Sequence, residues 1–219
     1  MSGAGTGRKI KGGILFAIEG IDGAGKTTQA EMLEIRLKKA GFDVIRLHEP
    51  TSSEWGMKIR EMANNGRNVK PEVELEYFLK DRKEDVDKNI KPALDRGAIV
   101  IMDRYYLSNV AYQGALEIDI DLIFKKNKFA PVPDIFIILD LAPKVGLSRV
   151  RKRENGRPNH FEDPDYLRDV REIFLQMEHR LPNVQCINAS RPLGQVTDNI
   201  WNICYAYIQK RMEQLANEQ

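Results

Sequence analysis

A glycine-rich stretch near the start of the chain carries residue types that bind phosphate. Residues 20–27, GIDGAGKT, place Gly20, Gly25, Lys26 and Thr27 in the spacing G-x(4)-G-K-[ST]. Such glycines let backbone N–H groups turn toward a phosphate, the lysine reaches the outer phosphates of a nucleotide, and the hydroxyl can hold Mg²⁺. The pattern arises by chance in roughly one chain in a hundred of this length. It therefore predicts a site for nucleotide phosphates.

The segments on either side of this loop fit that prediction. Residues 14–20 (ILFAIEG) form a short apolar run, which is typical of a strand buried on both faces of a parallel sheet. After the loop, Leu33 and Leu37 repeat at helical spacing. A helix that starts at Lys26 would direct its positive N-terminal end at the phosphate. A strand–turn–helix without a ligand is the alternative interpretation.

A second candidate site follows a later apolar run, AIVIMDRY at residues 98–105. Asp103 would end this strand beside the phosphates, where its carboxylate could help to hold Mg²⁺. Arg104 follows at the C-terminal end of the strand, where open α/β sheets bind ligands. A simple surface ion pair between the two residues is the alternative.

A basic run could act on the same phosphates. The stretch SRVRKRENGRP contains Arg149, Arg151, Lys152, Arg153 and Arg157. Such a run is usually a solvated face. In a phosphoryl-transfer enzyme, however, an arginine on a closing segment would neutralise charge on the moving group and exclude water.

The rest of the chain alternates short apolar segments with helical patterns, and these elements must position the residues above. The expected strands cover residues 14–20, 42–50, 98–105, 133–141 and 183–189. The expected helices cover residues 26–41, 55–66, 71–96 with a bend or end at Pro92, 106–130 with an interruption at Gly114, 143–155, 163–181 and 193–215. This alternation predicts an α/β fold with one five-stranded parallel sheet and helices on both faces.

The overall composition limits the function classes. The 219 residues, 42% of them hydrophobic, fit one domain, which we place at residues 14–219 after a flexible tail at residues 1–13. A net charge of +2 argues against a dedicated nucleic-acid binder. We see no apolar run of about 18 residues to span a membrane and no secretory signal. With only two cysteines, Cys186 and Cys204, we expect no zinc site or disulfide framework, and a cytoplasmic protein.

The phosphate loop alone does not separate a GTPase, an ATPase and a kinase. A GTPase should carry Asn-Lys-x-Asp after a later strand, but the nearest string, residues 127–130 (NKFA), lacks the aspartate. Transport and remodelling ATPases usually need a larger chain. A kinase of small molecules fits a compact single domain best.

Five stretches together resemble thymidylate (dTMP) kinases. They follow one another in the order and spacing seen in that family, and the resemblance covers about residues 14–201. The stretches are FAIEGIDGAGKTTQ, HEPT, EYFLKDR, DRYYLSNVAYQG and PDIFIILDL. It implies the P-loop nucleoside-monophosphate kinase fold, with a short lid at about residues 149–163. It also implies a homodimer that uses Mg²⁺ and transfers the γ-phosphoryl group of ATP to dTMP.

The resemblance implies roles on the ATP side. Arg149 would stack on adenine, near the loop at residues 188–192. Thr27 and Asp103 would hold the metal. The catalytic residues would be Lys26, Arg104, Arg153, Arg151 and Asp22. The ATP-binding residues of the loop would be Gly20, Ile21, Asp22, Gly23, Ala24, Gly25, Lys26, Thr27 and Thr28.

It also implies roles on the dTMP side. Phe78 would stack on thymine, and Arg82, four residues later on the same helical face, would bond the base and approach the acceptor phosphate. Arg104 would grip that phosphate bidentately. Tyr112 would crowd the 2′ side of the sugar. Asn109, Gln113, Asp22 and Glu49 would complete the site. From the residues alone, Phe78 and Tyr112 could instead be core aromatics and Arg82 a solvated charge.

One loop residue indicates the type of lid, and two stretches depart from the family pattern. Relatives with a small residue at the position of Ala24 carry basic lid residues, so we expect Arg153, and after it Arg151, to act on the transferred phosphoryl group. The chain has His48-Glu49-Pro50 where many relatives show Arg-Glu-Pro, and residues 159–162 (NHFE) where many show Asp-Arg-x-Glu. The alternatives in function are another nucleotide kinase, a deoxynucleoside kinase, or a nucleotide-binding regulator without turnover.

Overall fold

A parallel sheet forms the centre of the molecule. The computed structural model describes residues 7–66, 69–153 and 163–218. Its strands are β1 (Ile14–Glu19), β2 (Val44–His48), β3 (Ile99–Asp103), β4 (Ile135–Asp140) and β5 (Val184–Asn188), in the spatial order β2-β3-β1-β4-β5. All four pairings are parallel. The predicted five-stranded parallel sheet is confirmed.

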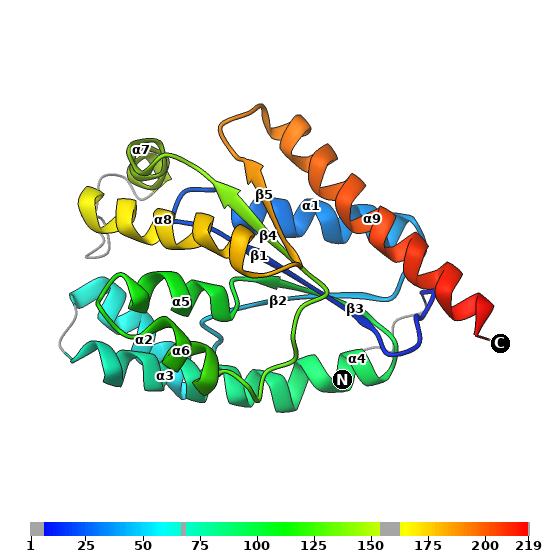
Figure 1. Cartoon of the computed structure of the whole chain (residues 1–219), viewed down its shortest axis with the longest axis horizontal. Helices are drawn as coiled ribbons and strands as arrows, with labels where there is room; N and C mark the ends of the chain where they lie inside the picture. The colour runs from blue at the N-terminus through cyan, green and yellow to red at the C-terminus, as the bar shows by residue number, and fades with distance from the viewer. Residues whose placement is uncertain (1–6, 67–68, 154–162, 219) are drawn as a thin grey trace.

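Helices cover both faces of this sheet (Figure 1). Helices α1 and α9 contact each other on one side, while α8 packs on β4 and β5 and α4 packs on β3. The helices are α1 (Lys26–Lys39), α2 (Glu54–Asn65), α3 (Pro71–Asp85), the π-helical η1 (Val86–Ile90), α4 (Lys91–Asp95), α5 (Tyr106–Gly114), α6 (Ile120–Lys126), α7 (Pro143–Arg153), α8 (Pro164–Arg180) and α9 (Leu193–Asn217).

Two helical segments differ in part from their predictions. Pro92 does not end the long helix, which continues through α3, η1 and α4 to Asp95. A proline ring clashes with the carbonyl group four residues earlier, here Lys88, and that residue lies in the wider π turn, which accommodates the ring. The helical segment predicted over residues 106–130 is interrupted at Gly114 as expected, since α5 ends there and α6 begins at Ile120, but residues 127–130 lie outside both helices.

The predicted loose tail is wrong for its described part, residues 7–13. The Arg8 N–H donates to the Gly41 carbonyl at 2.6 Å, and the Arg8 carbonyl accepts from Asp43 N–H at 3.0 Å. Ile10 donates to the Gly97 carbonyl at 2.8 Å and its side chain is buried. This segment therefore lies against the turn that precedes β2, because backbone bonds and one apolar anchor offset the entropy of ordering it.

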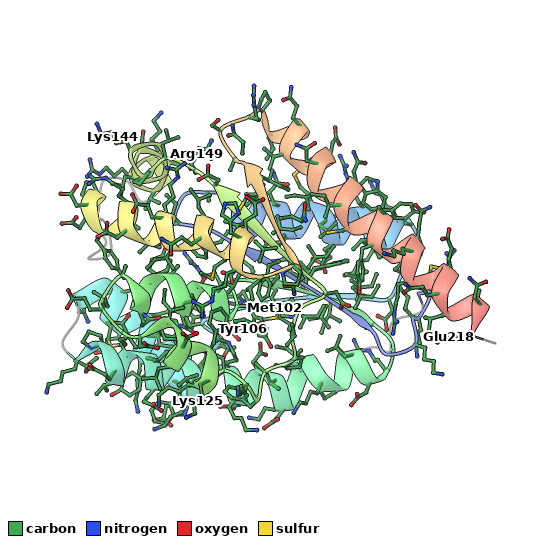
Figure 2. All side chains as sticks on the ribbon, in the orientation of Figure 1. Met102, Tyr106, Lys125, Lys144, Arg149 and Glu218 are labelled. Carbon is green, nitrogen blue, oxygen red and sulfur yellow. The ribbon has the colours of Figure 1, made fainter. Side chains whose placement is uncertain are left out.

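The apolar strands make the core. Every residue of β1 and β3 is buried, as expected for strands covered on both faces. Figure 2 shows Met102 and Tyr106 near the middle of the molecule, while Lys125, Lys144 and Glu218 lie at its edge. Within the described ranges, no helix is long and apolar enough to cross a membrane.

Candidate active site

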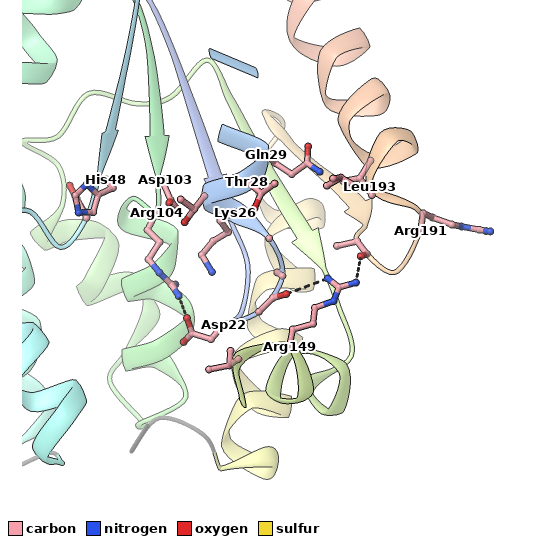
Figure 3. A pocket seen from close by; sticks show the side chains of 18 residues that line it. Asp22, Lys26, Thr28, Gln29, His48, Asp103, Arg104, Arg149, Arg191 and Leu193 are labelled. Carbon is pink, nitrogen blue, oxygen red and sulfur yellow. Dashed lines mark hydrogen bonds and ion pairs between the residues drawn. The ribbon is translucent and has the colours of Figure 1, made fainter. Parts of the chain in front are cut away.

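The carboxyl ends of β1 and β3 meet beside a large cavity (Figure 3). The two strands are neighbours, and Ile18 of β1 lies opposite Asp103 at the end of β3. The cavity has a volume of about 610 Å³, and its wall includes residues 22–29, Asp103 and Arg104. The strand order thus brings together the two sites that the sequence indicated separately.

The phosphate loop joins β1 to α1 through glycines with positive φ. Gly25, the N-cap of α1, has a φ of 97°. Gly23 has a φ of 77°, and a Cβ there would lie 2.2 Å from the Gly146 carbonyl oxygen. No other residue type fits at Gly23, because the backbone conformation and the close approach both exclude a side chain.

Lys26 lies within this loop. Its Nζ donates to the Ile21 carbonyl at 2.8 Å, and the residue is buried. Burial lowers the pKa of Lys26 to about 8; the charge of Arg104 acts in the same direction, while Asp22 and Asp103 oppose it. A cation in this position is suited to bind phosphate oxygens, which would restore its full charge.

A hydroxyl and a carboxylate lie together at the mouth of the loop. The Thr27 hydroxyl donates to Asp103 Oδ2 at 2.5 Å, joining the first turn of α1 to the end of β3. Hard oxygen atoms of this kind are the ligands that Mg²⁺ prefers. The structure therefore brings together the two residues predicted to hold the metal.

Arg104, Asp22 and Tyr112 form a second charged group. The Arg104 guanidinium donates to Asp22 Oδ1 at 2.5 Å and lies 5.3 Å from the centre of the Tyr112 ring, while the Tyr112 hydroxyl donates to Asp22 Oδ2 at 3.1 Å. Burial favours the neutral carboxyl group, but the charges of Arg104 and Lys26 outweigh it and hold the pKa of Asp22 to about 2. The backbone φ of Arg104 is 66°, an unfavourable conformation for a residue with a side chain.

A smaller cavity of about 230 Å³ adjoins the first. Helix α3 contributes Glu74 and Phe78 to its wall, and α5 contributes Asn109, Tyr112 and Gln113. Asp22, His48 and Arg104 line both cavities. Four of the residues predicted to bind the acceptor base and sugar, Phe78, Asn109, Tyr112 and Gln113, therefore share one wall.

Arg82 does not reach either cavity. Its side chain is only 1% exposed, and its guanidinium donates to Glu49 and to the amide oxygens of Asn109 and Asn127. It also lies 5.2 Å from the centre of the Tyr105 ring. In this structure Arg82 thus supports Asn109, and Glu49, which lines the larger cavity, is its ion-pair partner.

Several neighbours of the predicted residues escaped the sequence analysis. Glu19, the last residue of β1, is fully buried and accepts from Tyr105 N–H at 2.9 Å, Ser108 N–H at 3.2 Å and the Ser108 hydroxyl at 2.6 Å. Burial raises its pKa to about 7, against the opposing effects of Ser108 and Arg104. A glutamate inside an apolar strand was the available signal, because a buried carboxylate needs such partners.

Arg60 of α2 is another such residue. It lines the smaller cavity, and its guanidinium donates to the carbonyl groups of Thr51 and Pro50, both at 2.6 Å. Its position in a helix that looks like an ordinary amphipathic segment gave no signal of a role in the site.

The lid prediction is described only in part. Arg149 of α7 donates to the Gly23 and Ala189 carbonyl groups, both at 3.3 Å, and so bridges the phosphate loop and the loop after β5, as Figure 3 shows. Arg151 is exposed on the same helix. The side chain of Arg153 and all of residues 154–162 lie outside the described part of the chain.

Comparisons with known proteins identify the family of the chain. The family described as thymidylate kinase matches residues 18–200. A thymidylate kinase from Xanthomonas oryzae pv. oryzae (strain PXO99A) is 46% identical over 92% of this chain and 87% of its own length. A thymidylate kinase from Xylella fastidiosa (strain 9a5c) is 45% identical over 81% of this chain and 83% of its own length. The chain belongs to the thymidylate kinase family.

Proposed function

We propose that the protein transfers the γ-phosphoryl group of ATP to dTMP, giving ADP and dTDP. The observation that carries this proposal is the wall of Asp22, His48 and Arg104 shared by the two cavities. A donor nucleotide in the larger cavity and an acceptor nucleotide in the smaller one would bring their phosphates together at Arg104. The named activity of the relatives supports the same reaction.

The larger cavity suits the donor. The loop amides of residues 20–28 and the Lys26 ammonium would bind the phosphates of ATP, with the N-terminus of α1 behind them. Arg149 joins the loop to Ala189 and would lie beside the adenine ring. The family uses ATP; the individual contacts are our proposal.

The smaller cavity suits a deoxynucleoside monophosphate. Phe78 would stack on the base, while Asn109 and Gln113 offer amide groups to its edge. Tyr112 would lie beside the sugar. Arg104 would bind the acceptor phosphate, because a guanidinium matches two phosphate oxygens at once. Arg82 and Glu49 would hold Asn109 from behind.

Direct in-line transfer needs no phosphoenzyme and no strong base. A phosphate monoester dianion is already nucleophilic, so the protein mainly has to position the two substrates and neutralise charge on the moving group. Within the described site, Lys26 and Arg104 supply the positive charge that would neutralise the moving group. We propose that a lid arginine, Arg153 or Arg151, completes it when the lid closes.

Thr27 and Asp103 would hold Mg²⁺. Their oxygens lie 2.5 Å apart, and no described group of three or more His, Cys, Asp and Glu side chains could bind a metal by itself. This fits Mg²⁺, which usually takes only one or two protein ligands and fills its shell with water and phosphate oxygens. When bound, Mg²⁺ neutralises phosphate charge. We also propose a homodimer, on the resemblance alone; light scattering in solution tests it.

An acceptor panel tests the proposed function. ADP production would be measured with Mg²⁺-ATP and, separately, dTMP, dUMP, dGMP, dCMP, AMP, UMP and thymidine. We expect the highest kcat/KM with dTMP. A different preferred acceptor would preserve the kinase and the phosphate loop but refute the base contacts. No ADP with any acceptor, together with retained ATP binding, would refute the proposal in favour of a regulator.

A further inference from the structure

A directed chain of hydrogen bonds forms part of the wall of the smaller cavity. The Arg82 guanidinium donates to Asn109 Oδ1, Asn109 Nδ2 donates to Gln113 Oε1 at 3.0 Å, and Gln113 Nε2 donates to Glu74 Oε1 at 2.9 Å. All four side chains are 1% exposed. Two facing helices build this chain, since α3 contacts α5. Glu74 and Arg82 lie on one face of α3, and Asn109 and Gln113 lie one turn apart on α5.

The two charged ends impose one direction on the amides between them. A guanidinium only donates, so it must face the oxygen of Asn109. A carboxylate only accepts, so Glu74 must face the nitrogen of Gln113. Both requirements agree, and they fix the Gln113 amide with its oxygen toward Asn109 and its nitrogen toward Glu74. A flip of either amide would leave buried donors facing donors, which is costly.

A fixed amide can distinguish pyrimidine bases. An amide offers one acceptor beside one donor, and its nitrogen and oxygen each have a second bonding position beyond those in the chain. Thymine and uracil present an N3–H donor beside a C4 carbonyl acceptor. Cytosine presents the opposite order, an N3 acceptor beside a C4 amino donor. One orientation of the Gln113 amide therefore matches thymine and uracil, and the flipped orientation matches cytosine.

We propose that Glu74 is a positioning residue that sets base specificity: it locks the Gln113 amide in the orientation that accepts thymine and uracil and rejects cytosine. The inference rests on the proposed function, because it assumes that a pyrimidine nucleotide occupies this cavity. Glu74 acts through Gln113. It should therefore leave the choice between thymine and uracil unchanged, since these bases share the same edge and differ only in a methyl group.

Equilibrium binding without ATP tests this role separately from catalysis. Dissociation constants for dTMP, dUMP and dCMP would be measured by titration calorimetry on the full chain and on Glu74→Gln. A glutamine at this position can donate or accept, so it no longer fixes its neighbour. We expect the preference for dTMP over dCMP to fall by roughly tenfold, the scale of one correctly matched base contact. The ratio of dTMP to dUMP should stay constant.

The matched control is Glu76→Gln. Glu76 lies two residues away on the same helix, and its carboxylate pairs with Lys126 at 2.6 Å on the surface. This variant should keep every ratio. An unchanged ratio of dTMP to dCMP in Glu74→Gln, or equal weakening of all three nucleotides, would overturn the proposal. If the nucleotides bind with the expected ratios but the wild-type protein transfers no phosphoryl group to dTMP, only the proposed function is refuted.

A second variant covers the case in which Glu74→Gln does not fold. Gln113→Met keeps a similar volume and removes the amide that reads the base. It should lose the same part of the discrimination against dCMP, and Glu74→Gln in that background should add nothing further. Full discrimination in Gln113→Met, or an equal effect of Glu74→Gln in both backgrounds, would contradict a role through Gln113.

Discussion

At the scale of single residues, the site is a small set of charges arranged around Asp22 and Arg104. Asp22 stays ionised because Arg104 and Lys26 lie beside it, although burial favours its neutral form. Arg104 keeps an unfavourable backbone conformation while it bonds Asp22. Strain that persists at such a position fits a functional constraint on where the guanidinium lies.

Lys26→Ala should abolish turnover and leave the fold intact. The Lys26 ammonium group lies inside the phosphate loop, and its loss would remove charge stabilisation of the moving phosphoryl group. We expect a fall in kcat of at least about 10²-fold. Circular dichroism and ADP release would be measured together, with Lys38→Ala on the exposed side of the same helix as control. Near-normal turnover of Lys26→Ala would refute the mechanism.

Arg104→Lys should weaken the acceptor side more than the donor side. Lysine keeps the charge but cannot bind two phosphate oxygens in the planar geometry of a guanidinium. We expect kcat/KM for dTMP to fall by roughly 10–100-fold, as for the loss of one charge-assisted hydrogen bond, with a small change in KM for ATP. Steady-state kinetics at varied dTMP and varied ATP would show this. A change confined to the KM for ATP would show that Arg104 acts on the donor and would contradict its assignment to the acceptor phosphate.

The sequence could name most residues of the site but not where their side chains end. The spacing of Phe78 and Arg82 correctly put them on one helical face, yet the guanidinium turns to Glu49, Asn109 and Asn127 and not to the cavity. Helical spacing fixes the direction in which a side chain starts; the buried partners of a long, flexible residue come from other elements. The lid roles of Arg151 and Arg153 stay predictions.

At the scale of elements, the junctions between strand and helix decide the geometry of the site. Glu19 at the end of β1 accepts backbone N–H groups in the first turn of α5, where the N-cap residue Tyr105 provides no side-chain bond. The carboxylate thus caps α5 from another element and ties the helix that carries the proposed acceptor-binding residues to the strand that precedes the phosphate loop.

The stability conferred by Glu19 should depend on pH. Burial raises its pKa from about 4.5 to about 7, so the folded state binds the proton more tightly than the unfolded state. Stability is then greatest below pH 4.5 and is lost as pH rises toward 7, by about 3 kcal/mol for this group. Glu19→Gln lacks this loss. The free energy of unfolding would be measured in urea at pH 5 and pH 8.5. Relative to the wild type, the variant should be more stable at pH 8.5 than at pH 5. A constant difference would contradict a buried titrating carboxyl group.

Gly23→Ala should disrupt the phosphate loop. The added Cβ would lie 2.2 Å from the Gly146 carbonyl oxygen, at a φ of 77°. We expect a loss of at least about 1–2 kcal/mol in stability, because a residue with a Cβ is strained in this conformation, and weaker ATP binding. Gly194→Ala, where a Cβ would meet nothing within 4 Å, is the control and should be tolerated. Thermal melting with and without ATP would measure both effects; equal behaviour of the two variants would refute the steric account.

The elements themselves were largely predictable, for a physical reason. Short apolar runs between amphipathic segments specify buried parallel strands and covering helices, so all five strands were found. The π turn before Pro92 was not, because a proline in a helical pattern indicates a bend or an end but not a wider turn that accommodates the ring. The ordered segment at residues 7–13 was also missed, since its main contacts are backbone bonds that leave no trace in residue type.

At the scale of the whole molecule, the order of the strands creates the site. Placing β1 between β3 and β4 brings the phosphate loop beside Asp103, and α3 and α5 then enclose the smaller cavity. The alternation of elements predicted the sheet, and with it the edge at which we expect ligands to bind. The existence of two adjoining cavities with a shared wall required the three-dimensional structure.

The measurement that tests the central claim most directly is the stoichiometry of products formed by the wild-type protein. Mg²⁺-ATP and dTMP would be mixed with the enzyme, quenched over a time course, and ADP and dTDP counted by chromatography in the same samples. Direct transfer between the two cavities predicts one dTDP for each ADP at every time point. ADP without dTDP would mean that water accepts the phosphoryl group, and would contradict the account.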